Sequence, residues 1–513
     1  MFRELKYQTR ALNALREFFK LAYPKRNDPD GIAWAFSTAA QLRDDASDDT
    51  FNDGRRVVAQ RHYNAGDFAG KAVPWVCLRL PTGAGKTYLA ACAIGITAKE
   101  WLGGGQAGVM PLVLWLVPTD MILQQTLNAL KDITHPYREA LARDFGADID
   151  VISLSELPRI SPSEWGKKAV VIVSTGQALK IDVEKKDMRN VYAHTEDFET
   201  QFVNYQQSNY QKLADEFGLE RITLDDVRKA QEAAKNAPKD PNKAISLMSS
   251  EADIGKVKWS AINVLRLQKP IVIVDEAHKA QGDLSKEVLQ RINASSVIEL
   301  TATPKIDNEG RVVMNVLYHV SAQALKAENM VKLPVIIKEH LDNWQGAVAD
   351  AVFKRAELEQ IAQIETQNGG QYIRPIMLLQ AESETGHDPT TPEKLKAYLI
   401  EAHKIPGEQI AIATGKERGL NDVDLMLPSC QIRFVITVQA LVEGWDCPFA
   451  YVLCSIRNMK SNTAIVQLLG RVLRMPYAER RGHEALNCAY AYTITDYMGC
   501  LLYTSPSPRD RTR

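Results

Sequence analysis

The chain has 513 residues, of which 45% are hydrophobic and 24% charged, and its formal net charge is -1. This length allows about two to four domains of ~100–200 residues, and the composition is that of a globular protein that buries real cores. Since basic and acidic residues nearly balance, the overall charge gives no attraction for a polyanion. A nucleic-acid partner would therefore need a local basic groove.

The cysteines and the N-terminus exclude further classes. The seven cysteines are scattered without a CxxC pair, which favours buried thiols in a reducing compartment and indicates no zinc site. The N-terminus is charged and amphipathic and lacks the apolar segment of a signal peptide. No uncharged apolar run reaches the ~18 residues of a membrane span. We expect a cytoplasmic protein.

In chain order, a helix comes first and two series of strands follow. Apolar residues at helical spacing predict a helix over Leu5 to Tyr23. Short, wholly apolar runs bounded by turn residues then predict parallel strands covered on both faces. The first series comprises 73–80, 112–117, 169–174, 270–275 and 295–300, and the second comprises 374–380, 409–414, 433–438 and 450–456. The fold class is therefore α/β, with two tandem doubly wound parallel-sheet domains.

The domain boundaries follow from changes in composition along the sequence. We expect an N-terminal domain over 1–330, a hinge near Val331 to Pro334, and a C-terminal domain over 331–500. Residues 181–269 lack strand-like runs and predict a helical insertion, either a solvated decoration or a contact with nucleic acid or a partner. The tail from Leu501 to Arg513 resembles translated vector sequence, so we expect it to be non-native and the natural chain to continue differently.

A phosphate loop lies between the first strand of the series and a helix. Gly83, Ala84, Gly85, Lys86 and Thr87 stand in the sequence PTGAGKT. Glycines let backbone N–H groups form a concave nest, and the helix N-terminus adds partial positive charge. Lys86 is expected to reach the β- and γ-phosphates, and Thr87 to hold Mg²⁺. The general motif has Gly where Leu80 stands, a departure that helicases share.

An acidic pair ends a later apolar strand. Asp275 and Glu276 follow IVIV and stand in the sequence DEAH with His278. Asp275 is expected near Mg²⁺ beside Thr87, and Glu276 is expected to orient and deprotonate the attacking water. The order of the two motifs predicts neighbouring strands of one sheet. Alone, the pair could equally cap a helix, and His278 could be a hydrogen-bonded structural residue rather than a coupling one.

With these motifs the chain resembles superfamily-two helicases of the DEAH type, and within them the motor (Res) subunit of type III restriction enzymes. The resemblance runs from about Phe2 to Met498. It implies two RecA-like domains that hydrolyse ATP with Mg²⁺ at their interface. Tyr7 and Gln8 resemble the element that reads adenine, although a helix-surface Gln is an equal interpretation.

The resemblance also implies contacts with the nucleic-acid backbone. Thr119, with Gln124 and Gln125 behind it, resembles one such element, and Thr175 with Gln177 resembles a second. Small hydroxyl residues at strand ends can donate to phosphate without reading bases, but each could also be a plain strand-end turn. The segment with Thr301 and Thr303 resembles the motif that links the ATP site to the nucleic-acid site.

The second domain resembles the family in two further motifs. Gly444 and Asp446 match the fifth motif at the domain interface, and Gln467 with Arg471 and Arg474 matches the sixth. The two arginines are three apart and are expected on one face of a helix, where guanidinium groups could stabilise the γ-phosphate in the transition state. Thr437 and Asn462 are possible nucleic-acid contacts.

The resemblance therefore implies an ATP-dependent DNA translocase or helicase, which we expect to be the restriction subunit of a type III restriction-modification system. Its expected partners are duplex DNA and a modification (methyltransferase) subunit, without a membrane. The family's nuclease is not evident in this chain. Two alternatives stay open: an RNA helicase or remodeller outside restriction, and a slow ATP-gated clamp on nucleic acid.

Overall fold

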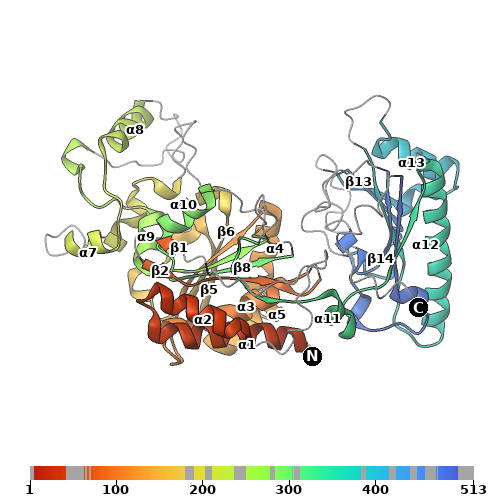
Figure 1. The fold of residues 1–513 in the computed structure, drawn as a ribbon. Coiled ribbons are helices and arrows are strands. Elements are labelled where there is room, and N and C mark those ends of the chain that lie inside the picture. Colours follow the sequence, from red (N-terminus) through yellow and green to blue (C-terminus); the bar gives the residue numbers. More distant parts are fainter. Residues whose placement is uncertain are drawn as a thin grey trace.

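The structure is a computed structural model. It describes residues 5–41, 63, 66–68, 71–81, 83–179, 190–202, 211–235, 250–277, 283–302, 304, 312–341, 343–382, 389–414, 423–438, 447–456, 469–470 and 472–494. Two sheets divide these residues into a first and a second lobe (Figure 1). The first sheet ends along the chain at His319, and the second begins at Val335.

The first lobe is built on a seven-stranded parallel sheet. Its order is β5 (Ile149–Ser153), β6 (Ala169–Thr175), β4 (Leu112–Val117), β7 (Ile271–Asp275), β8 (Ser296–Thr301), β3 (Trp75–Arg79) and β9 (Val316–His319). A separate antiparallel pair joins β1 (Gly66–Phe68) to β2 (Lys71–Val73). β4 and β6 are buried along their whole length, because helices cover both faces of the sheet.

Alternate residues of these strands enter two different cores. Val113, Trp115 and Val117 of β4 pack with the helices of one face, α1 (Lys6–Ala22), α3 (Lys86–Thr97), α4 (Asp120–Lys131) and α5 (Pro136–Phe145). Leu114 and Leu116 pack on the other face with α9 (Ala261–Gln268) and α10 (Asp283–Ile292). Helix α2 (Pro29–Gln41) packs on α1.

The second lobe is a six-stranded parallel sheet. Its order is β10 (Val335–Glu339), β15 (Ala489–Thr493), β14 (Ala450–Ser455), β11 (Ile376–Gln380), β13 (Phe434–Thr437) and β12 (Ile410–Ile412). Helices α12 (Trp344–Gln367) and α13 (Pro392–Glu401) pack on it, and α12 lies along the outer flank in Figure 1. Both sheets are parallel throughout, which confirms the predicted fold class of two doubly wound α/β domains.

The nine predicted strand runs all contain strands, and the helix at the N-terminus is confirmed as α1. Four strands of the two parallel sheets escaped prediction, namely β5, β9, β10 and β15, as did the small antiparallel pair of β1 and β2. Three of the four are edge strands of their sheets. β10 alternates between half-buried and exposed residues, so the uninterrupted apolar run that marks a central strand is missing there. β15, AYAYT, is central but built from small and aromatic residues.

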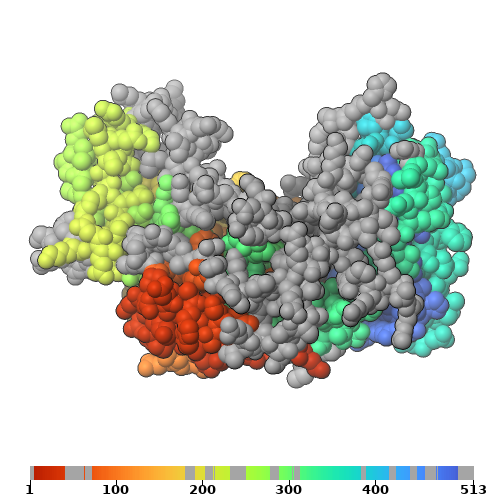
Figure 2. All heavy atoms as spheres, in the orientation of Figure 1, coloured from red at the N-terminus to blue at the C-terminus, as the bar shows by residue number. Residues whose placement is uncertain are grey.

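The predicted insertion contributes short helices that project from the first lobe, away from the second lobe (Figures 1 and 2). They are α6 (Glu199–Phe202), α7 (Gln211–Glu216) and α8 (Leu224–Lys235), followed by α9. Among the described residues, no helix is both long and apolar enough to cross a bilayer.

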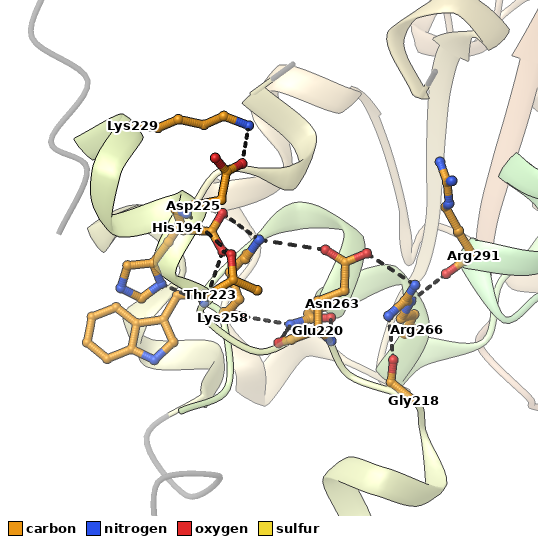
Figure 3. Close-up of polar contacts among 12 residues, drawn as sticks. His194, Gly218, Glu220, Thr223, Asp225, Lys229, Lys258, Asn263, Arg266 and Arg291 are labelled. Carbon is orange, nitrogen blue, oxygen red and sulfur yellow. Dashed lines mark hydrogen bonds and ion pairs between the residues drawn. The ribbon is translucent and has the colours of Figure 1, made fainter. Parts of the chain in front are cut away.

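A buried polar network fastens the insertion to the first lobe (Figure 3). The ammonium of Lys258 lies 2.9 Å from the Asp226 carboxylate and 3.8 Å from that of Glu220. Glu220 in turn pairs with Arg266, whose guanidinium donates to the backbone carbonyl of Arg291 on α10. Since α9 leads directly into β7, the insertion is tied to both helices that flank that strand.

Glu299 is a buried carboxyl in the centre of the first sheet. It stands on β8 opposite Cys77 of β3 and Val274 of β7. Burial raises the pKa of Glu299 to about 8, although a hydrogen bond with the Trp75 side chain opposes the shift. The folded protein therefore holds this side chain protonated at neutral pH.

Glu299→Gln is expected to stabilise the first lobe at pH 8 and to leave it unchanged near pH 4. In the unfolded chain this carboxyl ionises near pH ~4.3, so between there and about pH 8 only the unfolded state has lost the proton. The contribution of Glu299 to the free energy of unfolding is therefore highest at low pH, and it falls by up to about 5 kcal/mol as the pH rises. Urea unfolding at several pH values measures this. The exposed control Glu139→Gln should keep the wild-type profile, and an unaltered profile for Glu299→Gln would contradict the assignment.

Candidate ATP site between the lobes

The phosphate loop joins β3 to α3. Gly83 and Gly85 have φ of 90° and 75°, in the left-handed region that side chains disfavour. A Cβ on Gly85 would also lie 2.9 Å from Nε2 of Gln8. Gly85 is the N-cap of α3, and Lys86 is its first residue. The loop therefore ends on the N-terminus of a twelve-residue helix, the arrangement that binds phosphate.

Leu80 replaces the first glycine of the general motif without disturbing this loop. Its side chain is fully buried in the first core, and its N–H donates to the carbonyl of Thr301 at 2.8 Å. Leu80 therefore anchors the start of the loop on β8 and has no need of glycine's freedom.

The two acidic residues meet the loop from β7. Asp275 ends β7, and its Oδ1 accepts from the Glu276 N–H at 2.9 Å. Glu276 has φ of 49°, a left-handed conformation that costs energy in a residue with a Cβ. Its Oε1 lies 2.6 Å from Nζ of Lys86. Burial raises the pKa of Asp275 to about 6, and Lys86 opposes that shift.

The prediction that β3 and β7 are neighbours is wrong, because β8 lies between them. Parallel strands carry their C-terminal ends to one edge, so Lys86 and Glu276 still meet across the end of β8. The intervening strand is the one that carries Thr301, whose carbonyl holds Leu80. The strand between the two motifs is thus itself in contact with the phosphate loop.

Tyr7 and Gln8 on α1 both face the phosphate loop. The Tyr7 hydroxyl donates to the carbonyl of Ala84 at 3.0 Å, and Nε2 of Gln8 donates to the same oxygen at 3.4 Å. Both side chains are buried, so Gln8 is not a helix-surface residue. Burial raises the pKa of Tyr7 well above its usual value. The adenine-reading role of this pair stays a prediction.

Tyr137, on α5, belongs to this site but carries no sequence motif. Burial raises the pKa of the Tyr137 hydroxyl, and Arg474 and the Thr87 side chain oppose that shift. Glu328, at the end of α11 (Ala322–Ala327), similarly lies near enough to Tyr7 to affect its pKa. Both residues reach the site through packing of separate helices, so no local spacing could have indicated them.

Arg474 brings the second lobe to the phosphate loop. A Cβ on Gly83 would lie 3.8 Å from Nε of Arg474. Burial lowers the pKa of the Arg474 guanidinium, and the hydroxyls of Tyr137 and Tyr7 oppose this shift. A cation from the second lobe therefore stands among the groups of the first lobe that surround the phosphate loop.

The prediction that Arg474 lies on a helix face is wrong. Helix precedes it at Leu469, Gly470 and Val472, but Arg474 forms an isolated antiparallel bridge with Val331. The Leu473 carbonyl accepts from the Lys332 N–H, and the Met475 N–H donates to the Met330 carbonyl. Backbone groups of Leu473 and Met475 are therefore hydrogen-bonded to the interdomain linker instead of to a further turn of the helix.

The residues expected to contact nucleic acid lie at strand ends. Thr119 N-caps α4, and Thr175 ends β6, the strand paired with β4. Gln177 is exposed, whereas Thr301 is fully buried. Thr437 ends β13 in the second lobe and is buried. Thr119 and Thr175 thus share one edge of the first sheet, and their contact with nucleic acid stays a prediction.

Several predicted site residues lie outside the described residues. They are His278, Thr303, Gly444, Asp446, Asn462, Gln467 and Arg471. Within the described part of the chain, no three His, Cys, Asp or Glu residues gather in a cluster that could hold a metal ion. The Thr87 hydroxyl and the Asp275 carboxylate are oxygen donors that fit Mg²⁺, which normally takes its remaining ligands from phosphates and water.

The protein has two RecA-like lobes, each built on a parallel sheet. The first lobe carries the phosphate loop, and the second places Arg474 against that loop. The family described as type III restriction enzyme, res subunit, matches residues 2–306. The match covers more than half of the chain. The chain belongs to this family of helicase-like, ATP-dependent nucleic-acid motors, as its motifs predicted.

Several solved structures show weak similarity. Dbp5 from S. cerevisiae bound to RNA and ADP BeF3 is 13% identical over 85% of this chain and 84% of its own, with a TM-score of 0.37. The type ISP restriction-modification enzyme LlaBIII bound to DNA is 14% identical over 96% of this chain and 28% of its own, with a TM-score of 0.44. A fragment of a putative HsdR subunit of a type I restriction enzyme from Vibrio vulnificus YJ016 is 13% identical over 93% of this chain and 72% of its own, with a TM-score of 0.40. No curated protein matches the chain.

Proposed function

We propose that the chain is an ATP-driven translocase or helicase on duplex DNA, acting as the restriction subunit of a type III restriction-modification system. The position of Arg474 next to Gly83 carries the proposal, since it sets a cation of one lobe against the phosphate loop of the other. Family membership over residues 2–306 supports the restriction role. The proposed partners are duplex DNA and a methyltransferase subunit, in the cytoplasm.

Each described residue of the site has a task in ATP hydrolysis. Lys86 leaves Glu276 and binds the β- and γ-phosphates, while the backbone N–H groups around Gly83 and Gly85 hold the phosphate oxygens. Thr87 and Asp275 would hold Mg²⁺, which supplies positive charge to the phosphates. Glu276 orients the attacking water and accepts its proton. Arg474 stabilises the charge that develops on the γ-phosphate.

Hydrolysis in this arrangement depends on contact between the lobes. Arg474 reaches the phosphate loop from the second lobe, so phosphate release removes what the guanidinium binds and favours opening. Nucleotide state then biases a two-state hinge. Contacts near Thr119 and Thr175 on one lobe and Thr437 on the other would convert this opening and closing into movement along the strand.

Lys86→Ala is expected to lower ATP turnover in the presence of duplex DNA by about 10²–10³-fold or more, because it removes a fixed positive charge from the phosphates. A phosphate-release assay with DNA measures the loss, and thermal unfolding verifies the fold. Lys99→Ala, an exposed lysine just beyond the same helix, is the matched control. Retained turnover in Lys86→Ala would refute the site.

The same assay separates the alternatives. Stimulation of wild-type turnover by duplex DNA, and not by structured RNA, supports the proposal. Stimulation by structured RNA alone would instead identify an RNA helicase or remodeller. Binding of both ligands with negligible turnover would identify an ATP-gated clamp.

A further inference from the structure

Lys332 is a buried lysine in the linker between the lobes. Its side chain has no exposed surface, and its Nζ donates to the carbonyls of Pro448 at 2.9 Å and Ala450 at 2.6 Å. The same nitrogen lies 3.9 Å from the ring centroid of Tyr451. Among the described residues, its partners are thus carbonyl oxygens and an aromatic ring rather than a carboxylate. Burial lowers the pKa of Lys332 well below its ordinary value.

Packing alone gives no reason for a lysine here. An ammonium buried without an anion costs energy, and an apolar side chain of similar volume is usually at least as stable in such a position. Hydrogen bonds to two carbonyls and the ring contact offset part of that cost. Unlike an apolar side chain, the amino group makes directional hydrogen bonds. These bonds fix the position of the segment from Pro448 to Ala450.

That segment adjoins the predicted fifth motif. Pro448 follows Gly444 and Asp446 closely along the chain, and Ala450 begins β14, a central strand of the second sheet. The Lys332 side chain therefore ties the linker to the point where the chain passes from the fifth motif into the core of the second lobe.

The backbone of Lys332 is tied to the sixth motif. Its N–H donates to the Leu473 carbonyl at 2.6 Å, and the neighbouring Val331 bridges Arg474. Val331 itself is buried in the core of the first lobe, whereas Leu473 packs against the cores of both lobes. Lys332 and its neighbours thus connect the first core, the Arg474 backbone and β14 of the second lobe.

We propose that Lys332 is a positioning residue, which holds the Arg474 guanidinium at the phosphate loop by fastening the linker to Leu473 of the sixth motif and to the segment from Pro448 to Ala450. This inference rests on the proposed role of Arg474 in ATP hydrolysis. Lys332 touches neither nucleotide nor phosphate, so it acts only through Arg474. A displacement of about 1 Å at a reacting centre is enough to cost on the order of 10²-fold in rate.

Lys332→Met keeps the apolar stem and removes the amino group. We expect kcat for DNA-stimulated ATP turnover to fall about 10–100-fold, while KM for ATP and binding of a fluorescent ADP analogue stay within about threefold of wild type. Lys332→Gln, which can still donate to one carbonyl, should recover part of kcat. Lys338→Met is the control, since that side chain is 59% exposed on the neighbouring strand β10, and it should match wild type.

A double-variant cycle with Arg474→Ala distinguishes positioning from general stabilisation. If Lys332 acts through Arg474, Lys332→Met adds no further loss of kcat to Arg474→Ala. Losses that multiply would overturn the inference, as would a Lys332→Met variant with wild-type kcat. If Lys332→Met fails to fold, Lys332→Gln takes its place in the same cycle. A wild-type protein without turnover would refute the proposed function itself, whereas these outcomes concern Lys332 alone.

Discussion

Arg474→Ala is expected to abolish most ATP turnover, by about 10³–10⁵-fold, while leaving nucleotide binding to the first lobe nearly unchanged. The magnitude is that of an arginine which stabilises the transferring phosphoryl group. Arg474 is suited to that role because its Nε would lie 3.8 Å from a Cβ on Gly83. The ground-state contacts of the nucleotide come from Lys86 and the loop, so kcat should fall far more than affinity.

Single-turnover phosphate release with saturating ATP and duplex DNA measures this effect. Arg474→Lys retains the charge without the planar fork of donors and should recover only a small part of the rate. Arg480→Ala removes an exposed arginine that pairs with Glu484 in the same segment, and it should behave as wild type. Turnover of Arg474→Ala within about tenfold of wild type would exclude the catalytic role, since that loss is far below the range for such arginines.

Glu276→Gln is expected to lower ATP turnover by about 10²–10⁴-fold, the contribution of a positioned general base, and to tighten nucleotide binding. The second effect follows from the ion pair of 2.6 Å between Glu276 and Lys86. ATP must displace Glu276 to reach the ammonium, and a neutral amide competes less well for it. Affinity and rate should therefore change in opposite directions.

Equilibrium binding of a fluorescent ATP analogue, together with phosphate release, tests both effects. Glu216→Gln, an exposed acid in the insertion, is the control and should alter neither quantity. Unchanged phosphate release in Glu276→Gln would favour the slow clamp over the motor. Weaker binding in that variant would show that Glu276 assists the nucleotide rather than competing with it.

Local sequence was sufficient for the elements that carry their own pattern. The apolar runs of β4 and β7 predicted central strands because residues buried on both faces need no polar alternation. Gly83, Gly85 and Lys86 predicted the phosphate loop because its geometry depends on backbone freedom and a helix start within a few residues. The edge strands β5, β9 and β10 lack such runs, because polar residues such as Asp150, His319 and Lys338 interrupt or end them.

The sequence by itself therefore determined the two-sheet class, the phosphate loop and the acidic pair, because each depends on neighbours along the chain. Only the tertiary structure decided that β8 separates β3 from β7, that Arg474 leaves its helix to pair with Val331, and that Lys332 reaches the carbonyls of Pro448 and Ala450. Each of these contacts joins segments far apart in sequence, and the packing of whole lobes sets the distance between them.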